Sequence, residues 1–190
     1  RPHFILMMGD QVYVDDDAPD VFKDHLDSTS AVRRRAMAEK YFQNWSRTTV
    51  KEVLASVPTY MMWDDHDSRD GWGSLSADSP TLLAKYPRGQ AIFDKCDAYF
   101  QDARDVYWHF QGCHNPPLAA PFTGPPFVGR KAMPYMFRCG RVVVLMVDSR
   151  AARVLTPDQR SILDPAEMAW LDEQMQGGFD HLRVGTSLPF

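Results

Sequence analysis

Short apolar runs, each bounded by polar or turn-forming residues, are the clearest pattern along the chain. Runs of this length are typical of buried β-strands. The predicted strands are Phe4–Met8, Tyr60–Trp63, Arg141–Val147 and Leu182–Gly185. A further short run, Met136–Arg138, is expected to pair with the third of these strands across Gly140.

Between these runs, apolar side chains recur at the spacing of an α-helix. Ala31–Trp45 carries such a repeat and predicts the first helix. Thr49 and Glu52 form a capping-box signature for a second helix, which Pro58 ends. The residues between the first predicted strand and the first helix are polar and acidic, and we expect a loop there.

The second half of the chain adds two predicted helices. Ala91–Arg104 is the first of them, and Asp164 opens the other with Pro165 in its first turn and Gly177-Gly178 closing it. Five prolines in Cys113–Phe127 predict an irregular segment. The side chains expected to face inward from the last helix are Met168, Leu171 and Met175. Strands separated by helices indicate an α/β layered fold.

Composition narrows the class of protein without identifying its chemistry. The 190 residues are 44% hydrophobic and 24% charged, with a net charge of −4, which is ordinary for one globular domain. No apolar run approaches the roughly 18 residues of a membrane span. The mild acidity leaves no basic stripe, so duplex nucleic acid is not an expected partner. The three cysteines lack the spacing of a zinc site.

Three of the predicted strands end at aspartates, namely Asp10, the Asp64–Asp67 cluster and Asp148. In α/β sheets, ligands bind at the carboxyl ends of strands, so these turns are candidates for one shared site. Grouped carboxylates repel one another unless protons or cations neutralise them. An oxygen-preferring metal pair is the simplest such neutraliser.

Several motifs at these strand ends resemble the alkaline phosphatase D (PhoD-like) branch of the calcineurin-like metallophosphatases. They are Gly9-Asp10-Gln11-Val12-Tyr13, Trp63-Asp64-Asp65-His66-Asp67, Asp70-Gly71-Trp72-Gly73-Ser74, Val147-Asp148-Ser149-Arg150 and Gly185-Thr186-Ser187-Leu188-Pro189. The resemblance implies an α/β sandwich of two sheets flanked by helices. Residues 1–190 are expected to form an incomplete part of that one domain.

The resemblance also implies metal ligands. Asp10 matches the carboxylate that bridges two metals, Tyr13 matches a phenolate ligand, and Asp65 matches the position of a metal-binding Asn in the wider superfamily. A phenol with a pKa of about 10 ionises at neutral pH only beside a strong Lewis acid, so Tyr13 suggests ferric iron. The expected cofactor is therefore a dinuclear centre of Fe(III) with Ca, Mn or another divalent ion.

His66 matches a histidine that contacts the scissile phosphate, with Asp64 and Asp67 expected to orient it. The implied reaction is hydrolysis of a phosphate ester, a monoester or a diester, by a metal-bound hydroxide. Arg150 follows a strand end and is a candidate for holding phosphate with its guanidinium fork, while a structural ion pair involving Asp148 is an equal alternative.

Two parts of the family pattern are not found in the sequence: an Asp on a strand before Gly9, and a Gly-x-His pair after Phe190. We therefore expect an internal fragment of a longer protein, one that binds metal weakly and turns over slowly. A catalytically inactive folded or binding module remains the alternative, and so does another carboxylate-metal hydrolase. Asp15, Asp16 and Asp17 are expected to form a solvated face.

Overall fold

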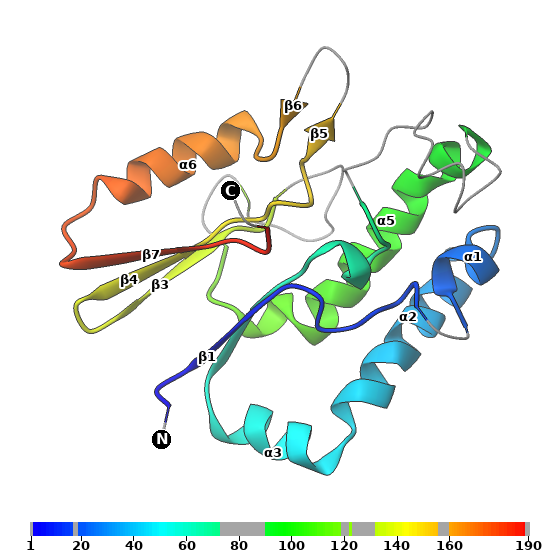
Figure 1. Ribbon diagram of the computed structural model, residues 1–190, viewed down its shortest axis with the longest axis horizontal. Coiled ribbons are helices and arrows are strands. Elements are labelled where there is room, and N and C mark those ends of the chain that lie inside the picture. The colour runs from blue at the N-terminus through cyan, green and yellow to red at the C-terminus, as the bar shows by residue number, and fades with distance from the viewer. Residues whose placement is uncertain are drawn as a thin grey trace.

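The computed structural model describes residues 2–16, 19–72, 90–118, 122, 132–155 and 160–188. Figure 1 shows two groups of elements, one around α2 and α5 and the other around β3, β4, β7 and α6. Among the described residues, no helix combines the length and the apolar composition that a membrane crossing requires.

The first group is built on a short parallel pair of strands. β1 (Ile5–Met8) pairs with β2 (Thr59–Met62) from Ile5↔Thr59 to Met8↔Met62. The connection between them holds three helices: α1 (Val21–His25), α2 (Ser30–Trp45) and α3 (Thr48–Ser56). Because the two strands are parallel and in register, the segments that follow them leave the sheet at the same edge.

The second group is a three-stranded sheet in the order β3-β4-β7. β3 (Tyr135–Cys139) and β4 (Val142–Met146) form an antiparallel hairpin, whereas β4 and β7 (His181–Gly185) are parallel. The crossover between β4 and β7 contains the β5 (Val154–Leu155) and β6 (Arg160–Ser161) pair and then α6 (Pro165–Met175).

Both faces of β4 are buried, and this makes the sheet the middle layer of the fold. Val144 and Met146 belong to the core cluster that includes α5 (Gln90–Phe110) and α2. Val143 and Leu145 belong to a second cluster, with residues of α6. Two 3-10 turns complete the described elements: η1 (Asp65–Asp67) after β2 and η2 (Gly112–His114) after α5.

The predicted strands and the four predicted helices are present, so the expected mixed α/β character is confirmed. The described strands form three small sheets, and the two-sheet sandwich stays a prediction. Residues 17, 73–74, 119–121, 123–127 and 189 of the segments discussed above lie outside the described residues.

Three details of the helix predictions are wrong. The short helix α1 lies where we expected only a loop. Arg47, not Thr49, is the N-cap of α3, and its side chain makes no capping hydrogen bond. In α6, Met168 and Met175 are 44% and 47% exposed, and the side chains that face the core are Glu167, Trp170 and Leu171.

Candidate metal centre

The ends of three strands approach one another closely at Gly9, directly after β1. Gly9 has a φ of +104°, and a Cβ at this position would lie 2.6 Å from Cβ of Asp64 and 3.0 Å from Cβ of Ser187. Asp64 follows β2 and Ser187 follows β7. Only glycine fits this conformation and this spacing, so the small residue lets the aspartates converge.

Asp67 joins the segments that follow β1 and β2. Its Oδ2 accepts hydrogen bonds from the backbone N–H of Asp10 at 3.1 Å and of Asp64 at 2.9 Å. Its Oδ1 accepts from the Tyr41 hydroxyl at 3.2 Å and from Nε2 of Gln111 at 2.7 Å. Burial raises the pKa of Asp67 from 3.8 to about 7. This carboxyl therefore connects both strand ends to α2 and to the end of α5.

Asp10 has left-handed backbone geometry, with a φ of 54°, and its carboxylate forms a cluster with two others. One carboxylate oxygen from each of Asp10, Asp64 and Asp65 lies within 4.8 Å of the other two. Burial raises the pKa of Asp10, and the nearby charges of Asp64 and Asp65 raise it further. Three grouped oxygen ligands that repel one another fit a hard cation.

Tyr13 lies over this cluster on the loop that follows β1. Its hydroxyl donates to Oδ2 of Asp10 at 3.2 Å, and its ring stacks on His66 with 4.2 Å between the centroids. The charge of Asp10 is the main cause that raises the pKa of Tyr13. Without a cation beside it, the phenol keeps its proton, and its oxygen is nevertheless within reach of the same site.

His66 is held by two aspartates. Its backbone N–H donates to Oδ1 of Asp10 at 3.3 Å, and its Nδ1 lies 2.8 Å from Oδ1 of Asp15. Burial alone would lower the pKa of His66, but the Asp15 hydrogen bond and the charges of Asp15, Asp65 and Asp10 raise it overall. Asp65, His66 and Asp70 also lie close enough together to share a cation.

Asp15 was expected on a solvated face, and this expectation is wrong. It is 5% exposed, and its second oxygen accepts a hydrogen bond from the backbone N–H of Asp70. Asp15 and His66 are 51 residues apart, so sequence spacing gives no sign of their contact.

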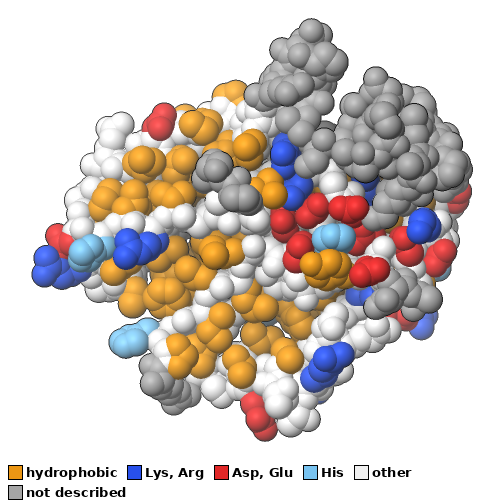
Figure 2. All heavy atoms as spheres, viewed as in Figure 1, with side chains coloured by type: hydrophobic (Ala, Val, Ile, Leu, Met, Phe, Trp, Pro, Cys, Tyr) orange, Lys and Arg blue, Asp and Glu red, His pale blue; other side chains and the backbone are white. Residues whose placement is uncertain are grey.

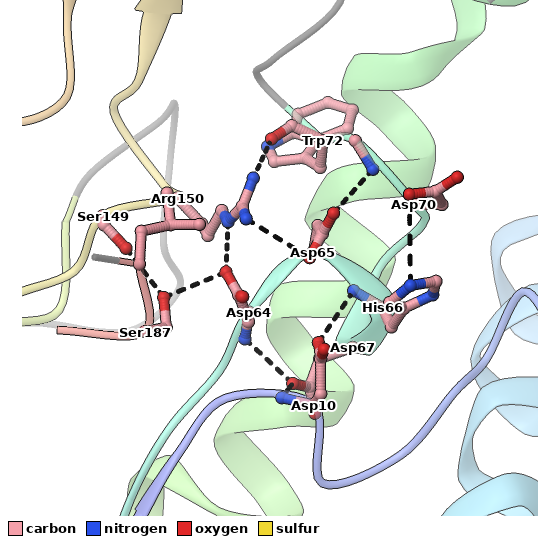
Figure 3. Close-up of polar contacts among 12 residues, drawn as sticks. Asp10, Asp64, Asp65, His66, Asp67, Asp70, Trp72, Ser149, Arg150 and Ser187 are labelled. Atoms are coloured by element: carbon pink, nitrogen blue, oxygen red, sulfur yellow. Dashed lines mark hydrogen bonds and ion pairs between the residues drawn. The ribbon is translucent and has the colours of Figure 1, made fainter. Parts of the chain in front are cut away.

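Arg150 lies on the loop after β4, on the side of the acidic cluster opposite to His66 (Figure 3). Its guanidinium is ion-paired with Asp64, lies 3.3 Å from Oδ1 of Asp65, and donates to the carbonyl of Trp72 at 2.8 Å. The residue is only 3% exposed. Its charge therefore offsets part of the charge of the cluster.

The neighbouring Asp148 has a structural environment. It is fully buried, and it accepts hydrogen bonds from Nε1 of Trp63 at 2.8 Å and from the backbone N–H of Met133 at 2.9 Å. Two more backbone N–H groups, those of Arg150 and Ala151, donate to it.

Ser187 was noted in the sequence only as part of a motif and was not selected as a site residue. Its hydroxyl donates to Oδ1 of Asp64 at 2.9 Å.

All five residues selected from the sequence thus lie in one cluster: Asp10, Tyr13, Asp65, His66 and Arg150. In Figure 2, acidic side chains gather around a histidine on this face of the molecule.

A family model for PhoD-like phosphatases matches residues 1–179, which is most of the chain. The chain belongs to the PhoD-like phosphatase family.

A solved structure agrees with this PhoD-like assignment. The chain is similar to the structure of PhoD, with a TM-score of 0.61 and 14% sequence identity. The match covers 97% of this chain and 36% of the PhoD chain, so these residues span about a third of the length of that relative. At this identity the likeness shows the fold alone. A search of curated proteins finds no match.

Proposed function

We propose that this PhoD-like chain carries part of a metal-dependent phosphoesterase site that hydrolyses phosphate monoesters or diesters. The observation that supports this most is the convergence of Asp10, Tyr13, Asp65 and His66 where β1 and β2 end. Family membership supports the reaction class. The acidic cluster supports a cation, because its three carboxylate oxygens lie within 4.8 Å of one another and the charges of Asp64 and Asp65 act against that of Asp10, although Arg150 pairs with two of the three.

Asp10, Tyr13 and Asp65 are the proposed metal ligands. Their carboxylate and phenol oxygens suit a centre of Fe(III) with Ca, Mn or another divalent ion. When bound, such a centre supplies positive charge for phosphate oxygens and lowers the pKa of water towards 7. Asp64 is held by its contacts with Arg150 and Ser187, and it orients the neighbouring ligands Asp10 and Asp65.

His66 is the proposed proton donor. Asp15 engages Nδ1, so Nε2, which lies 4.0 Å from Oδ1 of Asp70, is the ring nitrogen proposed to donate to the substrate. A raised pKa keeps the ring protonated to higher pH, as a group that protonates a leaving alkoxide requires. Arg150 is proposed to stabilise charge on the phosphate side with its guanidinium, which lies beside Asp64 and Asp65 of the cluster.

The test compares turnover with metal binding. Wild-type chain and His66→Ala are assayed on p-nitrophenyl phosphate and bis-p-nitrophenyl phosphate with added iron, calcium or manganese. We expect His66→Ala to lose about 100-fold or more of the turnover and to keep its calorimetric metal affinity. His181→Ala is the matched control, because His181 is an exposed histidine at the start of β7. Equal activity of His66→Ala and wild type would contradict the role.

A folded module without substantial turnover is the second candidate. It is favoured by the short span of the PhoD chain that is matched and by the ion pairs of Arg150 with two of the three clustered carboxylates. On this view the chain binds metal weakly and turns over slowly. Calorimetry that finds two tightly bound metals per chain, together with multiple turnovers, would rule it out.

A further inference from the structure

A hollow opens directly beside the acidic cluster, between the loop after β1 and the C-terminal half of α2. Its volume is about 640 Å³, and Asp10 and Tyr13 form part of its wall. It is therefore continuous with the proposed site, and a substrate held there would extend into it. The remaining lining residues are Gln11, Val12, Asp16, Lys40, Gln43, Asn44 and Arg47.

One face of α2 forms the wall opposite the loop. Lys40, Gln43 and Asn44 lie at the spacing i, i+3 and i+4, and Arg47 lies at i+7, just beyond the helix. Residues at this spacing share one side of a helix. With a rise of about 1.5 Å per residue, the helical part of the row from Lys40 to Asn44 is roughly 6 Å long, and Arg47 follows beyond the end of the helix. All four side chains carry N–H donors.

Only two of these four side chains make hydrogen bonds within the described residues. Lys40 donates to the carbonyl of Asp16 at 2.7 Å, and Asn44 donates to the carbonyl of Lys40 at 3.2 Å. The side chains of Gln43 and Arg47 make no hydrogen bond or ion pair within the part of the chain that the structure describes. Both are exposed. The cationic end of the hollow therefore has unused donors, while the carboxylates of Asp10 and Asp16 lie on the loop side.

We propose that Gln43 and Arg47 bind a second anionic group of the substrate, a carboxylate or a phosphate, carried on the alcohol part of the ester. This inference rests on the proposed function, because it places the scissile phosphate at the acidic cluster. A guanidinium and an amide N–H offer such a group charge-assisted hydrogen bonds. Phosphate esters with a charged second group are then preferred over those with a plain alcohol.

The test uses non-hydrolysable probes, so it does not depend on turnover. Binding of benzylphosphonate, 4-carboxybenzylphosphonate, p-xylylene diphosphonate and 4-(hydroxymethyl)benzylphosphonate is measured by calorimetry on the Mn²⁺-loaded chain. Wild type is expected to bind the two probes with an anionic second group, 4-carboxybenzylphosphonate and p-xylylene diphosphonate, about three- to tenfold more tightly than benzylphosphonate. The carboxylate and phosphonate probes separate the two sources of the anion.

Variants assign this preference to its residues. Arg47→Ala is expected to reduce the ratio of affinities to near one, and Arg47→Glu to reverse it. Lys51→Ala is the matched control, because it removes one positive charge from the exposed face of α3, outside the hollow, and should keep the ratio.

Four results would overturn the inference. Equal binding of all four probes by wild type would leave the proposed phosphate site standing and exclude the anion subsite. A preference that survives in Arg47→Glu, or that the hydroxymethyl probe shares, would show that another group or a hydroxyl is recognised. Failure of every probe to bind would contradict the proposed function and the subsite together.

Discussion

Asp67 accepts a hydrogen bond from the backbone N–H of Asp10, at 3.1 Å and across 57 residues of sequence. The same carboxylate oxygen accepts from the N–H of Asp64. The side chain of Asp67 is 1% exposed, so no water competes for these bonds. One buried carboxyl thus fixes the backbone on which two of the clustered aspartates lie.

Replacing Asp67 by Ala should destabilise the fold and disperse the acidic cluster. The N–H groups of Asp10 and Asp64 would lose their acceptor, and so would the side chains of Tyr41 and Gln111. We expect a loss of about 2–4 kcal/mol of unfolding free energy. Urea denaturation measures the loss, with the exposed Asp172→Ala on α6 as the control. Wild-type stability of Asp67→Ala would show that the hydrogen bonds contribute little.

Asp15 should matter most for substrates whose leaving group needs a proton. It holds His66 through Nδ1, so Asp15→Ala removes the acceptor at Nδ1 and makes the ring less readily protonated. We expect turnover of phenyl phosphate to fall roughly 10- to 100-fold, and that of 2,4-dinitrophenyl phosphate, a much better leaving group, to fall far less. Equal losses on the two esters would indicate a general structural defect instead.

Arg150 should stabilise the metal-free chain by offsetting the charge of Asp64 and Asp65. Its side chain is 4% exposed and that of Asp64 is 10% exposed, so Arg150→Met leaves buried carboxylates unpaired. We expect a loss of about 3–5 kcal/mol in unfolding free energy. Added Mn²⁺ should then stabilise Arg150→Met more than wild type.

The matched control for Arg150 is Arg141→Met, which breaks an ion pair with Asp180 in which the arginine side chain is 80% exposed. Little change is expected there, because solvent screens such pairs. A small effect of Arg150→Met, comparable to that of the control, would contradict the assigned role.

Glu167 should make stability depend on pH. It accepts a hydrogen bond from the backbone N–H of Asp148 at 2.6 Å, and its other oxygen has no partner among the described residues. Burial raises its pKa from 4.5 to about 9, and the charges of Asp148 and Asp164 add to this. The folded chain then keeps a proton that the unfolded chain releases.

Because the pKa of this carboxyl is raised in the folded chain, we expect the unfolding free energy to fall as pH rises. Between pH 4.5 and about 9, the unfolded chain binds fewer protons, so the contribution of Glu167 to stability falls progressively as pH rises, by about 1.4 kcal/mol per pH unit at most. Glu167→Gln cannot ionise, and its unfolding free energy should fall less over pH 5 to 9. Parallel profiles for the two proteins, measured by urea denaturation, would contradict this.

The strands and the strand-end site could be predicted because their signals are local. An apolar run followed by an aspartate, as at Met8 and Trp63, carries both the burial and the chemistry in a few adjacent residues. The parallel register of β1 and β2 then brings Asp10 and Asp64 to one edge.

What could not be predicted depends on contacts between distant residues. Asp15 is buried and is bound there by His66 and by the backbone N–H of Asp70, both distant in sequence. On α6, the side chain that faces the protein core is that of Glu167 and not that of Met168, because Glu167 accepts a hydrogen bond from the backbone N–H of Asp148. Periodicity scales treat a carboxylate as polar, so neither position reads as interior from the sequence.

At position 10, with its left-handed backbone, thermal stability and metal binding favour different residues. Its φ of 54° costs an L residue on the order of 1 kcal/mol, whereas glycine adopts it freely. A library of variants selected only by melting temperature should therefore gather Gly at position 10 and discard the carboxylate at the centre of the cluster. Engineering of this fold has to score metal binding alongside melting, or it will improve the scaffold by deleting the site.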